Sequence, residues 1–267
     1  MDQGQHLTAR QMGEQTANRW LLAGTLPLRA LRQTVRDDLA ALGAVCRRLE
    51  QAPPEQQARP AVRWLLENWY LARRAGAQAE RALRARHRLR ALREQGRVLR
   101  LEQAGRALAG LACFEEREIA AFLSGIQDVE PLEEEELAAL PQAIVAGLLT
   151  DLRRTAEELE ALTVCREHTS RDWEGEFREL FARLRRLQAA HLGPWLEELS
   201  VVDRLFRLDP AGVYPEMDAD SRRGYRTALC RLARRAHRSQ AACAQQVLDL
   251  ARQGSGERAH IGWYLFR

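Results

Sequence analysis

Apolar residues recur every three to four positions along nearly the whole chain. The positions between them are filled mainly with Ala, Leu, Glu, Gln and Arg, which are strong helix formers. No segment shows a convincing apolar–polar alternation of the kind that marks a half-buried strand. The pattern therefore predicts an all-α fold, a multi-helix bundle of about eight to ten helices, arranged as one bundle or as two packed helical subdomains.

Prolines, glycines and short polar stretches divide this pattern into separate helices. The segments 51–60 and 124–131 are expected to be a turn or short linker and a loop. We expect two domains, an N-terminal helical segment over 1–54 and a helical domain over 55–267, with a subdivision near 165–193. The expected helices are 15–50 with a break at 24–27, 61–95, 98–112, 115–124, 132–162 interrupted at Pro141, 171–191, 194–208, 219–237, and 239–252 with Ser239 as N-cap.

The second of these helices carries more apolar surface than one stripe can hold. Trp64, Leu65, Trp69 and Leu71 cannot all lie on one face of a helix with 3.6 residues per turn. We therefore expect the helix over 61–95 to pack on two sides.

One stretch, "DPAGVYPEMDADSRRGYR" at 209–226, departs from the helical pattern. Its Asp218-Ala219-Asp220 matches the Asp-x-Asp pair with which nucleotide-sugar glycosyltransferases hold a divalent cation. That use requires a strand ahead of the pair, and the preceding residues are too short and are broken by proline. Asp readily caps a helix, so we favour Asp218 or Asp220 as the N-cap of the next helix, and expect Tyr214 and Met217 to pin the loop to the core.

The composition is that of a globular protein, with 46% hydrophobic and 29% charged residues. All 41 basic residues are arginine, while the formal net charge is only +4. Codon bias in a GC-rich genome explains this, and so does selection of arginine for bidentate phosphate or carboxylate contacts. The second explanation requires arginine clustered on one face, whereas arginine occurs in every expected helix. We therefore expect no nucleic-acid binding.

Other candidate chemistry is sparse, and the sequence predicts no catalytic, cofactor-binding or metal-binding residue. Cys165 and His168 have chelating spacing, but no second pair lies near them. We interpret the glutamates 133–136 as the first turn of a helix rather than as a metal site, because negative side chains there interact favourably with the helix dipole. No phosphate-binding glycine motif occurs. Five widely spaced cysteines are expected to be reduced, mostly half-buried apolar residues, namely Cys46, Cys113, Cys165, Cys230 and Cys243.

The two ends of the chain and its hydropathy pattern lead to an expectation about where the protein is located in the cell. "MDQGQHLTARQMGEQ" lacks the charged-then-apolar pattern of a signal peptide, and no stretch approaches twenty apolar residues. We therefore expect a cytoplasmic protein, or one peripheral at the inner membrane. The apolar ending "HIGWYLF" is expected either to dock back onto the helices or to lead into further protein.

Four segments, in order, resemble the cyclic β-1,2-glucan synthases, which are glycosyltransferases of family 84 and large bacterial inner-membrane enzymes. They are "ARPAVRWLLENWYL" (58–71), "VEPLEEEELAALPQAIVAGLLTDLRRTAEEL" (129–159), "LSVVDRLFRLDPAGVYPEMDADSRRGYRTALCRLARRA" (199–236) and "ERAHIGWYLF" (257–266). The third is the most specific, and 75–125 and 163–190 match poorly. Ala219 stands where the family usually has Phe, and Arg223-Gly224 where it usually has Asp-Arg. Asp220 replaces a small residue of the family pattern, so the Asp-x-Asp pair is an accident of that replacement, which further weakens the metal-site interpretation.

The resemblance implies a non-catalytic helical region, because that family carries its catalytic residues outside this part. It implies a protein partner, the glycosyltransferase or membrane portion of a synthase, joined in cis or met in trans, and UDP-glucose-dependent glucan synthesis by the whole assembly. The alternative is a free-standing helical protein-interaction module without enzymatic role. The residues that carry the motifs, all with expected structural roles, are Trp64, Asn68, Pro131, Leu132, Glu136, Leu137, Pro141, Asp209, Pro210, Gly212, Tyr214, Met217, Asp218, Arg222, Tyr225, Arg226, His260, Gly262 and Tyr264.

Overall fold

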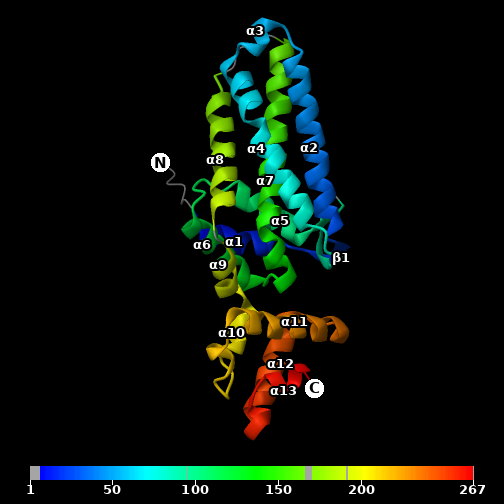
Figure 1. The fold of residues 1–267 in the computed structure, drawn as a ribbon, viewed down its shortest axis with the longest axis vertical. Helices are drawn as coiled ribbons and strands as arrows, with labels where there is room; N and C mark the ends of the chain where they lie inside the picture. Colours follow the sequence, from blue (N-terminus) through cyan, green and yellow to red (C-terminus); the bar gives the residue numbers. More distant parts are fainter. Residues whose placement is uncertain (1–6, 95, 166–169, 191, 267) are drawn as a thin grey trace. The chain divides into compact units, whose positions relative to one another are not determined.

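The computed structural model describes residues 7–94, 96–165, 170–190 and 192–266. This part of the chain contains thirteen α-helices and one small three-stranded sheet (Figure 1), so the predicted all-α class is confirmed. Packing divides the chain into two compact units, each assembled from separate segments. The bundle unit comprises Arg19–Ile119 and Ala139–Ala190, and the motif unit comprises Met1–Asn18, Ala120–Ala138 and His191–Arg267.

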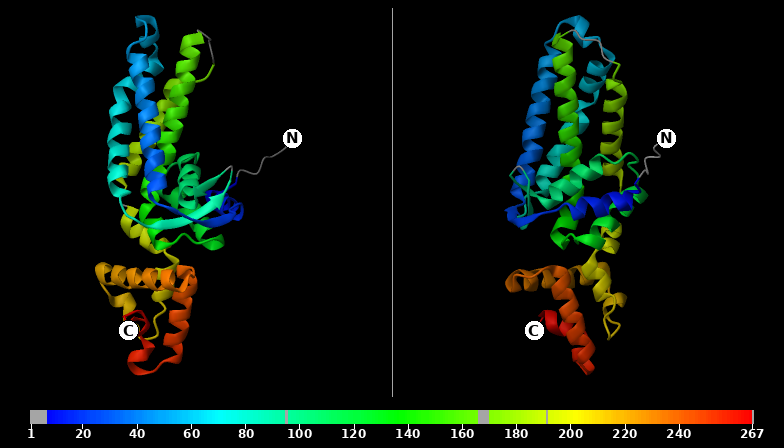
Figure 2. Two further views of the ribbon diagram at one scale, coloured as in Figure 1. Left: turned by 90° about the vertical axis from the view of Figure 1, so that its right-hand side faces the viewer. Right: turned by 180° about the vertical axis from the view of Figure 1, so that it is seen from behind.

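Four long helices lie side by side in the bundle unit (Figures 1 and 2). They are α2 (Arg29–Glu50), α4 (Pro60–Ala82), most of α7 (Glu134–Cys165) and α8 (Trp173–Ala189), joined by the shorter α3 (Pro54–Gln57) and α5 (Arg100–Ala109). The Trp64 ring of α4 lies 5.5 Å from the ring of Phe181 in α8, and Trp69 lies against Gly43 of α2. Helix α4 is therefore packed on two sides, as predicted.

A small antiparallel sheet, which the hydrophobic pattern did not predict, completes the bundle unit. Its strands are β1 (Leu22–Pro27), β2 (Arg88–Arg93) and β3 (Arg97–Leu99), in the order β1-β2-β3. Helix α4 ends at Ala82, so the prediction of one helix over 61–95 was wrong at its C-terminal end. Arg88, Leu89, Arg90 and Ala91 do alternate, but all are good helix formers. The short strand β3 follows directly, whereas the other partner strand, β1, lies about sixty residues earlier in sequence.

Helix α6 (Glu116–Val129) runs through most of the segment 124–131 that was predicted to be a loop. The glycine that suggested the loop, Gly125, serves helix packing instead. A Cβ atom on Gly125 would lie 2.1 Å from the carbonyl oxygen of Arg10 in α1 (Ala9–Asn18). Only glycine leaves room for this close approach within the motif unit.

Helix α7 continues through Pro141, where an interruption was predicted. Proline removes one backbone donor and disfavours a helix interior. Leu140, Ala143 and Ile144 are nearly completely buried around it. Burial of this apolar surface on both sides of the proline outweighs the lost hydrogen bond, so the helix does not end there.

The single helix predicted over 194–208 is divided at Ser200 into α9 (Leu192–Leu199) and α10 (Val201–Phe206). The Ser200 hydroxyl accepts a hydrogen bond from the Asp203 backbone N–H at 2.9 Å and so caps α10. A serine three residues ahead of an acidic residue is a known helix-start pattern, which the hydrophobic periodicity concealed.

The core of the motif unit is built from its C-terminal helices. These are α10, α11 (Ala219–Ala236), α12 (Gln240–Gln253) and α13 (Gly262–Phe266), with short 3₁₀ turns at Tyr214–Glu216 and Gly256–Ala259. Ile261 is completely buried in this core, and Tyr264 and Leu265 pack against it, so the apolar ending docks back onto the helices. The buried residues are Val202, Phe206, Tyr214, Leu229, Ala233, Cys243, Ala244, Val247, Leu248, Ala251 and Ile261.

Local capping predictions are confirmed at two helix starts. Asp218 caps α11, because its Oδ1 accepts from the Ser221 N–H at 2.8 Å and its Oδ2 from the Ser221 hydroxyl at 2.8 Å. Ser239 caps α12, with its Oγ accepting from the Ala242 N–H at 3.3 Å. The hydrogen bonds from Ser221 lower the pKa of the Asp218 carboxyl.

Replacing Asp218 with alanine is expected to lower the melting temperature by about 2–4 °C, because the first turn of α11 loses its cap. Asp220→Ala is the matched control. Among the described residues the Asp220 side chain pairs only with the exposed side chain of Arg223, so this change should leave the melting temperature unchanged. The measurement is thermal unfolding followed by circular dichroism. Equal losses in the two variants would contradict the capping role. Because the Asp218 pKa is lowered in the folded state, its stabilisation is present above the unfolded pKa and is lost as the pH falls through the folded pKa.

Candidate functional site

Asp209 lies at the centre of the region that carries the most specific motif. Its side chain is completely buried just beyond the end of α10. Oδ2 accepts from the backbone N–H groups of Val213 and Tyr214 at 3.2 and 3.4 Å, and Oδ1 accepts from the Ile261 N–H at 3.1 Å. Asp209 thus joins the loop that follows it to the C-terminal segment some fifty residues later, which goes beyond its predicted role of ending a helix.

A hydrogen-bonded chain runs from Asp209 through His260 to Tyr225. His260 Nδ1 lies 2.7 Å from Asp209 Oδ2, and His260 Nε2 lies 2.9 Å from the Tyr225 hydroxyl. In the neutral imidazole this places the proton on Nδ1, donated to the carboxylate, while Nε2 accepts from tyrosine. A Cβ atom on Gly262 would lie 2.7 Å from both His260 Nε2 and the Tyr225 hydroxyl, so this position accommodates only glycine.

A second network surrounds Arg226, which is almost completely buried in α11. Its guanidinium reaches three carboxylates from three other helices. Nε lies 3.1 Å from Glu134 Oε2, Nη1 donates to Asp203 Oδ1 at 3.0 Å, and Nη2 donates to Glu197 Oε1. Arg226 therefore holds the starts of α7 and α10 and the end of α9 against α11.

Other polar side chains join the same network. The Tyr214 hydroxyl donates to Asp203 Oδ1 at 2.8 Å, and Arg207 Nε donates to Asp203 Oδ2 at 2.6 Å. Ser200 donates its hydroxyl hydrogen to Glu134. Burial is the largest cause of a raised Glu134 pKa, opposed by the Ser200 hydrogen bond and by Arg226. Burial and Asp203 likewise raise the pKa of Tyr214.

The chain of Asp209, His260 and Tyr225 contains residue types that occur in catalytic relays, and here it also links the C-terminal segment to α11. Burial, with a smaller contribution from Asp209, raises the pKa of Tyr225, whereas an activated phenol requires a lowered pKa. Both nitrogens of His260 are already hydrogen-bonded. The Tyr225 ring also packs edge-on against Phe266 at 4.9 Å and Tyr214 at 5.8 Å. This arrangement fastens the C-terminal segment to α11.

The turn that follows α10, within the motif segment 209–226, is also stabilised by its own contacts. Gly212 has φ +67°, in the left-handed region that favours glycine, and its N–H donates to the Asp209 carbonyl at 2.9 Å. Pro210 lies exposed in the same turn. Tyr214 is completely buried and Met217 packs against the core, as predicted. Two further motif residues hydrogen-bond to nearby backbone carbonyls: Arg222 donates to the Met217 carbonyl at 2.7 Å, and Tyr264 donates to the Leu250 carbonyl at 3.1 Å.

The earlier motif residues lie at the start of α7 and in α4. Leu132 and Leu137 are buried, Pro131 is half-buried, and Glu136 Oε2 accepts from the Glu133 N–H at 2.9 Å, a capping role. Trp64, Asn68 and Pro141 belong to the bundle unit and so are not brought into the Asp209 and Arg226 networks. There Asn68 donates to the Trp64 carbonyl at 2.9 Å.

Sequence reasoning missed the acidic partners of Arg226. Glu134 had been assigned only to the first turn of α7, and Glu197 and Asp203 had been given no role. One signal was present: Asp203 interrupts the apolar run "SVVDRLF" at a position that the helical period places toward the core. A buried carboxylate requires a cationic partner, but the sequence does not identify which of 41 arginines supplies it.

The described residues hold no group of three or more His, Cys, Asp or Glu side chains suited to a metal ion. His168 lies outside the described residues, and nothing is described of the Cys165 side chain, so this pair is not placed. Cys46, Cys230 and Cys243 are buried and Cys113 is exposed. Burial raises the pKa of the Cys46 thiol to about 12, which makes it a poor nucleophile.

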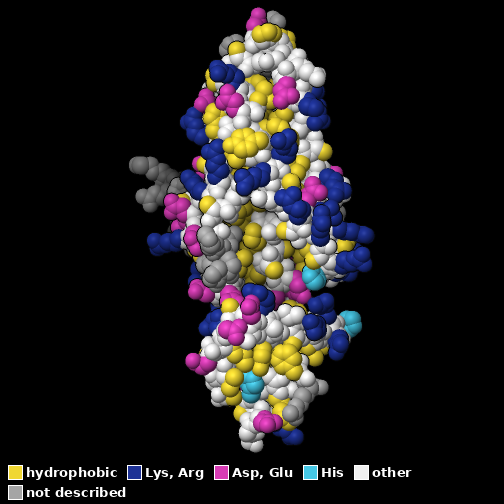
Figure 3. All heavy atoms as spheres, viewed as in Figure 1, with side chains coloured by type: hydrophobic (Ala, Val, Ile, Leu, Met, Phe, Trp, Pro, Cys, Tyr) yellow, Lys and Arg dark blue, Asp and Glu magenta, His cyan; other side chains and the backbone are white. Residues whose placement is uncertain are grey.

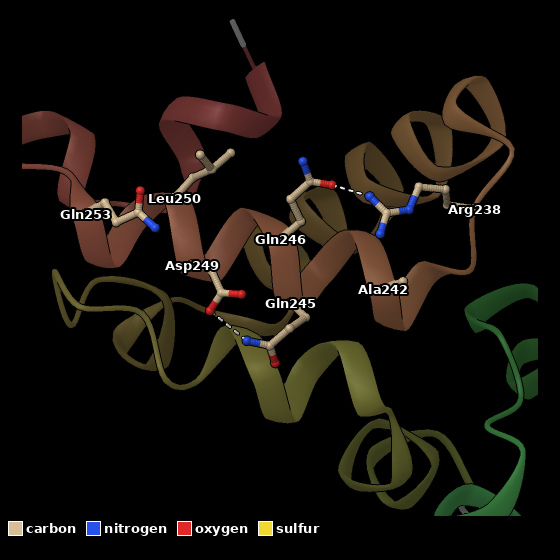
Figure 4. A pocket seen from close by; sticks show the side chains of 7 residues that line it. All are labelled: Arg238, Ala242, Gln245, Gln246, Asp249, Leu250 and Gln253. Carbon is tan, nitrogen blue, oxygen red and sulfur yellow. Dashed lines mark hydrogen bonds between the residues drawn. The ribbon is translucent and has the colours of Figure 1, made fainter.

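A surface pocket lies along α12, away from the two networks (Figure 4). Its polar groups are paired with each other: Gln245 donates to Asp249 at 2.8 Å, and Arg238 donates to Gln246. None of the motif residues lines it. The lining residues are Arg238, Ala242, Gln245, Gln246, Asp249, Leu250 and Gln253.

No protein-family model matches this sequence, and a search of curated proteins likewise finds no match. None of the helices in the described ranges combines the length and apolar character needed to cross a bilayer.

Proposed function

We propose that this chain is a non-catalytic helical accessory or scaffold region of a cyclic β-1,2-glucan synthase-like glycosyltransferase. The observation that supports the proposal is the convergence of the most specific motif residues on each other. Asp209, Tyr214, Tyr225 and Arg226 come from the third motif segment and His260 from the fourth, and together they form two adjoining networks within one unit.

This convergence favours a scaffold role, because the motif residues are engaged in holding helices together. Each polar atom of the chain Asp209, His260 and Tyr225 has a protein partner. Catalytic groups instead need a reachable position for the reacting atom and a pKa suited to the reaction. The partner is the glycosyltransferase or membrane portion of the synthase, joined in cis or bound in trans.

The test is complementation in trans. Membranes containing a cyclic β-1,2-glucan synthase that lacks its own N-terminal helical region are supplied with this chain and with radiolabelled UDP-glucose. We expect glucan synthesis to be restored only when the chain is present, and no glucose transfer by the chain alone. Membranes with the intact synthase are the control, and their activity should not respond to the added chain.

Failure to restore synthesis, with a folded chain and active control membranes, would overturn the accessory role and favour the free-standing interaction module. Glucose transfer by the chain alone would overturn the non-catalytic part of the proposal.

A further inference from the structure

The segment 84–100 carries the most concentrated charge in the bundle unit. Its seventeen residues include seven arginines and one glutamate, a formal net charge of +6, while the whole chain has +4. The remaining residues therefore sum to −2. Codon bias alone distributes arginine without regard to its acidic neighbours, so it does not account for a segment in which arginine is almost unopposed. The arginines are Arg84, Arg86, Arg88, Arg90, Arg93, Arg97 and Arg100.

The sheet presents several of these arginines to solvent. Figure 3 shows basic side chains gathered at the side of the molecule where Figure 1 labels β1. Arg88 and Arg97 come from neighbouring strands, and both donate to the Thr25 carbonyl of β1, at 2.8 and 3.0 Å. This shared acceptor fixes two guanidinium groups over the edge strand.

Three further arginines, Arg84, Arg86 and Arg93, are exposed, and their side chains have no hydrogen-bond or ion-pair partner among the described residues. An arginine in this state keeps all five N–H donors available for a bound anion. The positive charge of these three side chains is therefore available to a partner.

Two large apolar side chains lie exposed at the same sheet. Leu21 is 67% exposed and Leu22 is 45% exposed. The Leu21 carbonyl accepts from the Arg93 N–H at 2.8 Å, and Leu22 pairs with Leu92 across the β1–β2 ladder. Arg93 in turn pairs with Arg97 of β3. The leucines thus flank the basic strands.

We propose that the basic sheet edge, defined as Leu21 and Leu22 together with Arg84, Arg86, Arg88, Arg93 and Arg97, docks onto an anionic phospholipid surface. Guanidinium groups bind lipid phosphates, and each basic residue near an anionic leaflet adds to the affinity. Adjacent apolar side chains enter the boundary between head groups and acyl chains. Single-stranded nucleic acid offers phosphates too, but its binding relies on stacking of bases on exposed aromatic rings, whereas the exposed apolar groups here are leucines.

The experiment is co-sedimentation of the full chain with phosphatidylcholine vesicles and with vesicles containing added phosphatidylglycerol. We expect binding only to the anionic vesicles, and its loss at about 1 M salt, where the Debye length falls to about 3 Å. The triple variant R84Q/R86Q/R93Q should bind on the order of 100-fold more weakly, since each arginine contributes roughly fivefold. The variant L21S/L22S should bind roughly tenfold more weakly.

The matched control is R63Q/R73Q/R74Q on α4, which removes the same charge from exposed positions of the same unit and should retain most of the binding. Equal losses in the two triple variants would overturn the proposal, because attraction would then depend on net charge alone. Absence of binding to anionic vesicles would also overturn it. So would tighter binding to a short DNA duplex than to vesicles at equal salt, unaffected by L21S/L22S. The inference does not depend on the proposed function, and complementation does not test it.

Discussion

Replacing Arg226 with methionine is expected to destabilise the motif unit by about 3–5 kcal/mol at neutral pH, the usual cost of removing one partner from a buried charge network. Three carboxylates approach this guanidinium, and their side chains are all less than 20% exposed: 18% for Glu134, 19% for Glu197 and 1% for Asp203. Arg207 remains beside Asp203 and Arg222 beside Glu197, but no other ion pair to Glu134 occurs among the described residues. The measurement is urea unfolding.

The pH dependence of this loss follows from Glu134. Its pKa is already raised by burial, and Arg226 is one of the groups that oppose the rise, so the variant raises it further. A carboxyl whose folded pKa lies above its unfolded pKa destabilises the fold at higher pH. This penalty disappears as the pH falls through the folded pKa toward the unfolded value. The deficit of the variant should therefore be smaller near pH 5 than near pH 7.

Two further variants make the test specific. Arg223→Met changes a neighbouring arginine of α11 that is 68% exposed and pairs only with the exposed Asp220, so it should leave stability unchanged within error. Arg226→Lys keeps the charge but cannot reach three carboxylates at once, and should fall between the wild type and Arg226→Met. Equal stability of Arg226→Met and the wild type at pH 7 would contradict the buried network.

The capping residues show what the sequence could predict. Asp218 and Ser239 bond to backbone groups three residues ahead, so the decisive interaction lies inside one short segment. Helix formation over most of the chain is likewise set by local propensity and period. These predictions required no knowledge of distant residues.

The sheet and the Arg226 network show what the sequence alone could not predict. Residues 88–93 have helical propensity, and they form a strand because β1, about sixty residues earlier, and the short β3 both supply backbone partners. The partners of Arg226 come from positions 134, 197 and 203, which only the folded chain brings together. The predicted loop at Gly125 and the predicted helix break at Pro141 were wrong for a related reason. Both residues disfavour helices by local rules, but packing against other residues keeps Gly125 within α6 and Pro141 within α7.

Replacing Gly105 with alanine is the clearest test of packing against propensity in the bundle unit. Gly105 lies in α5, and its added Cβ would be 2.3 Å from the carbonyl oxygen of Ala143 in α7. From the other side, a Cβ on Gly147 would lie 2.9 Å from the Gly105 carbonyl oxygen. The two helix backbones are therefore in direct contact, and the obstructing atoms cannot move without moving a helix.

Helix propensity and overpacking predict opposite changes in the stability of Gly105→Ala, so the experiment decides between them. Helix propensity alone predicts that Gly105→Ala stabilises the protein by up to about 1 kcal/mol. Overpacking against backbone atoms predicts a loss of about 3 kcal/mol, because α5 must separate from α7. We expect the loss, measured by urea unfolding. In the control Gly110→Ala, at the end of the same helix, the added Cβ would lie 3.6 Å from the Arg106 carbonyl oxygen, an ordinary van der Waals contact. This change should cost less than about 1 kcal/mol. A gain in stability for Gly105→Ala would mean that the two helices do not approach this closely.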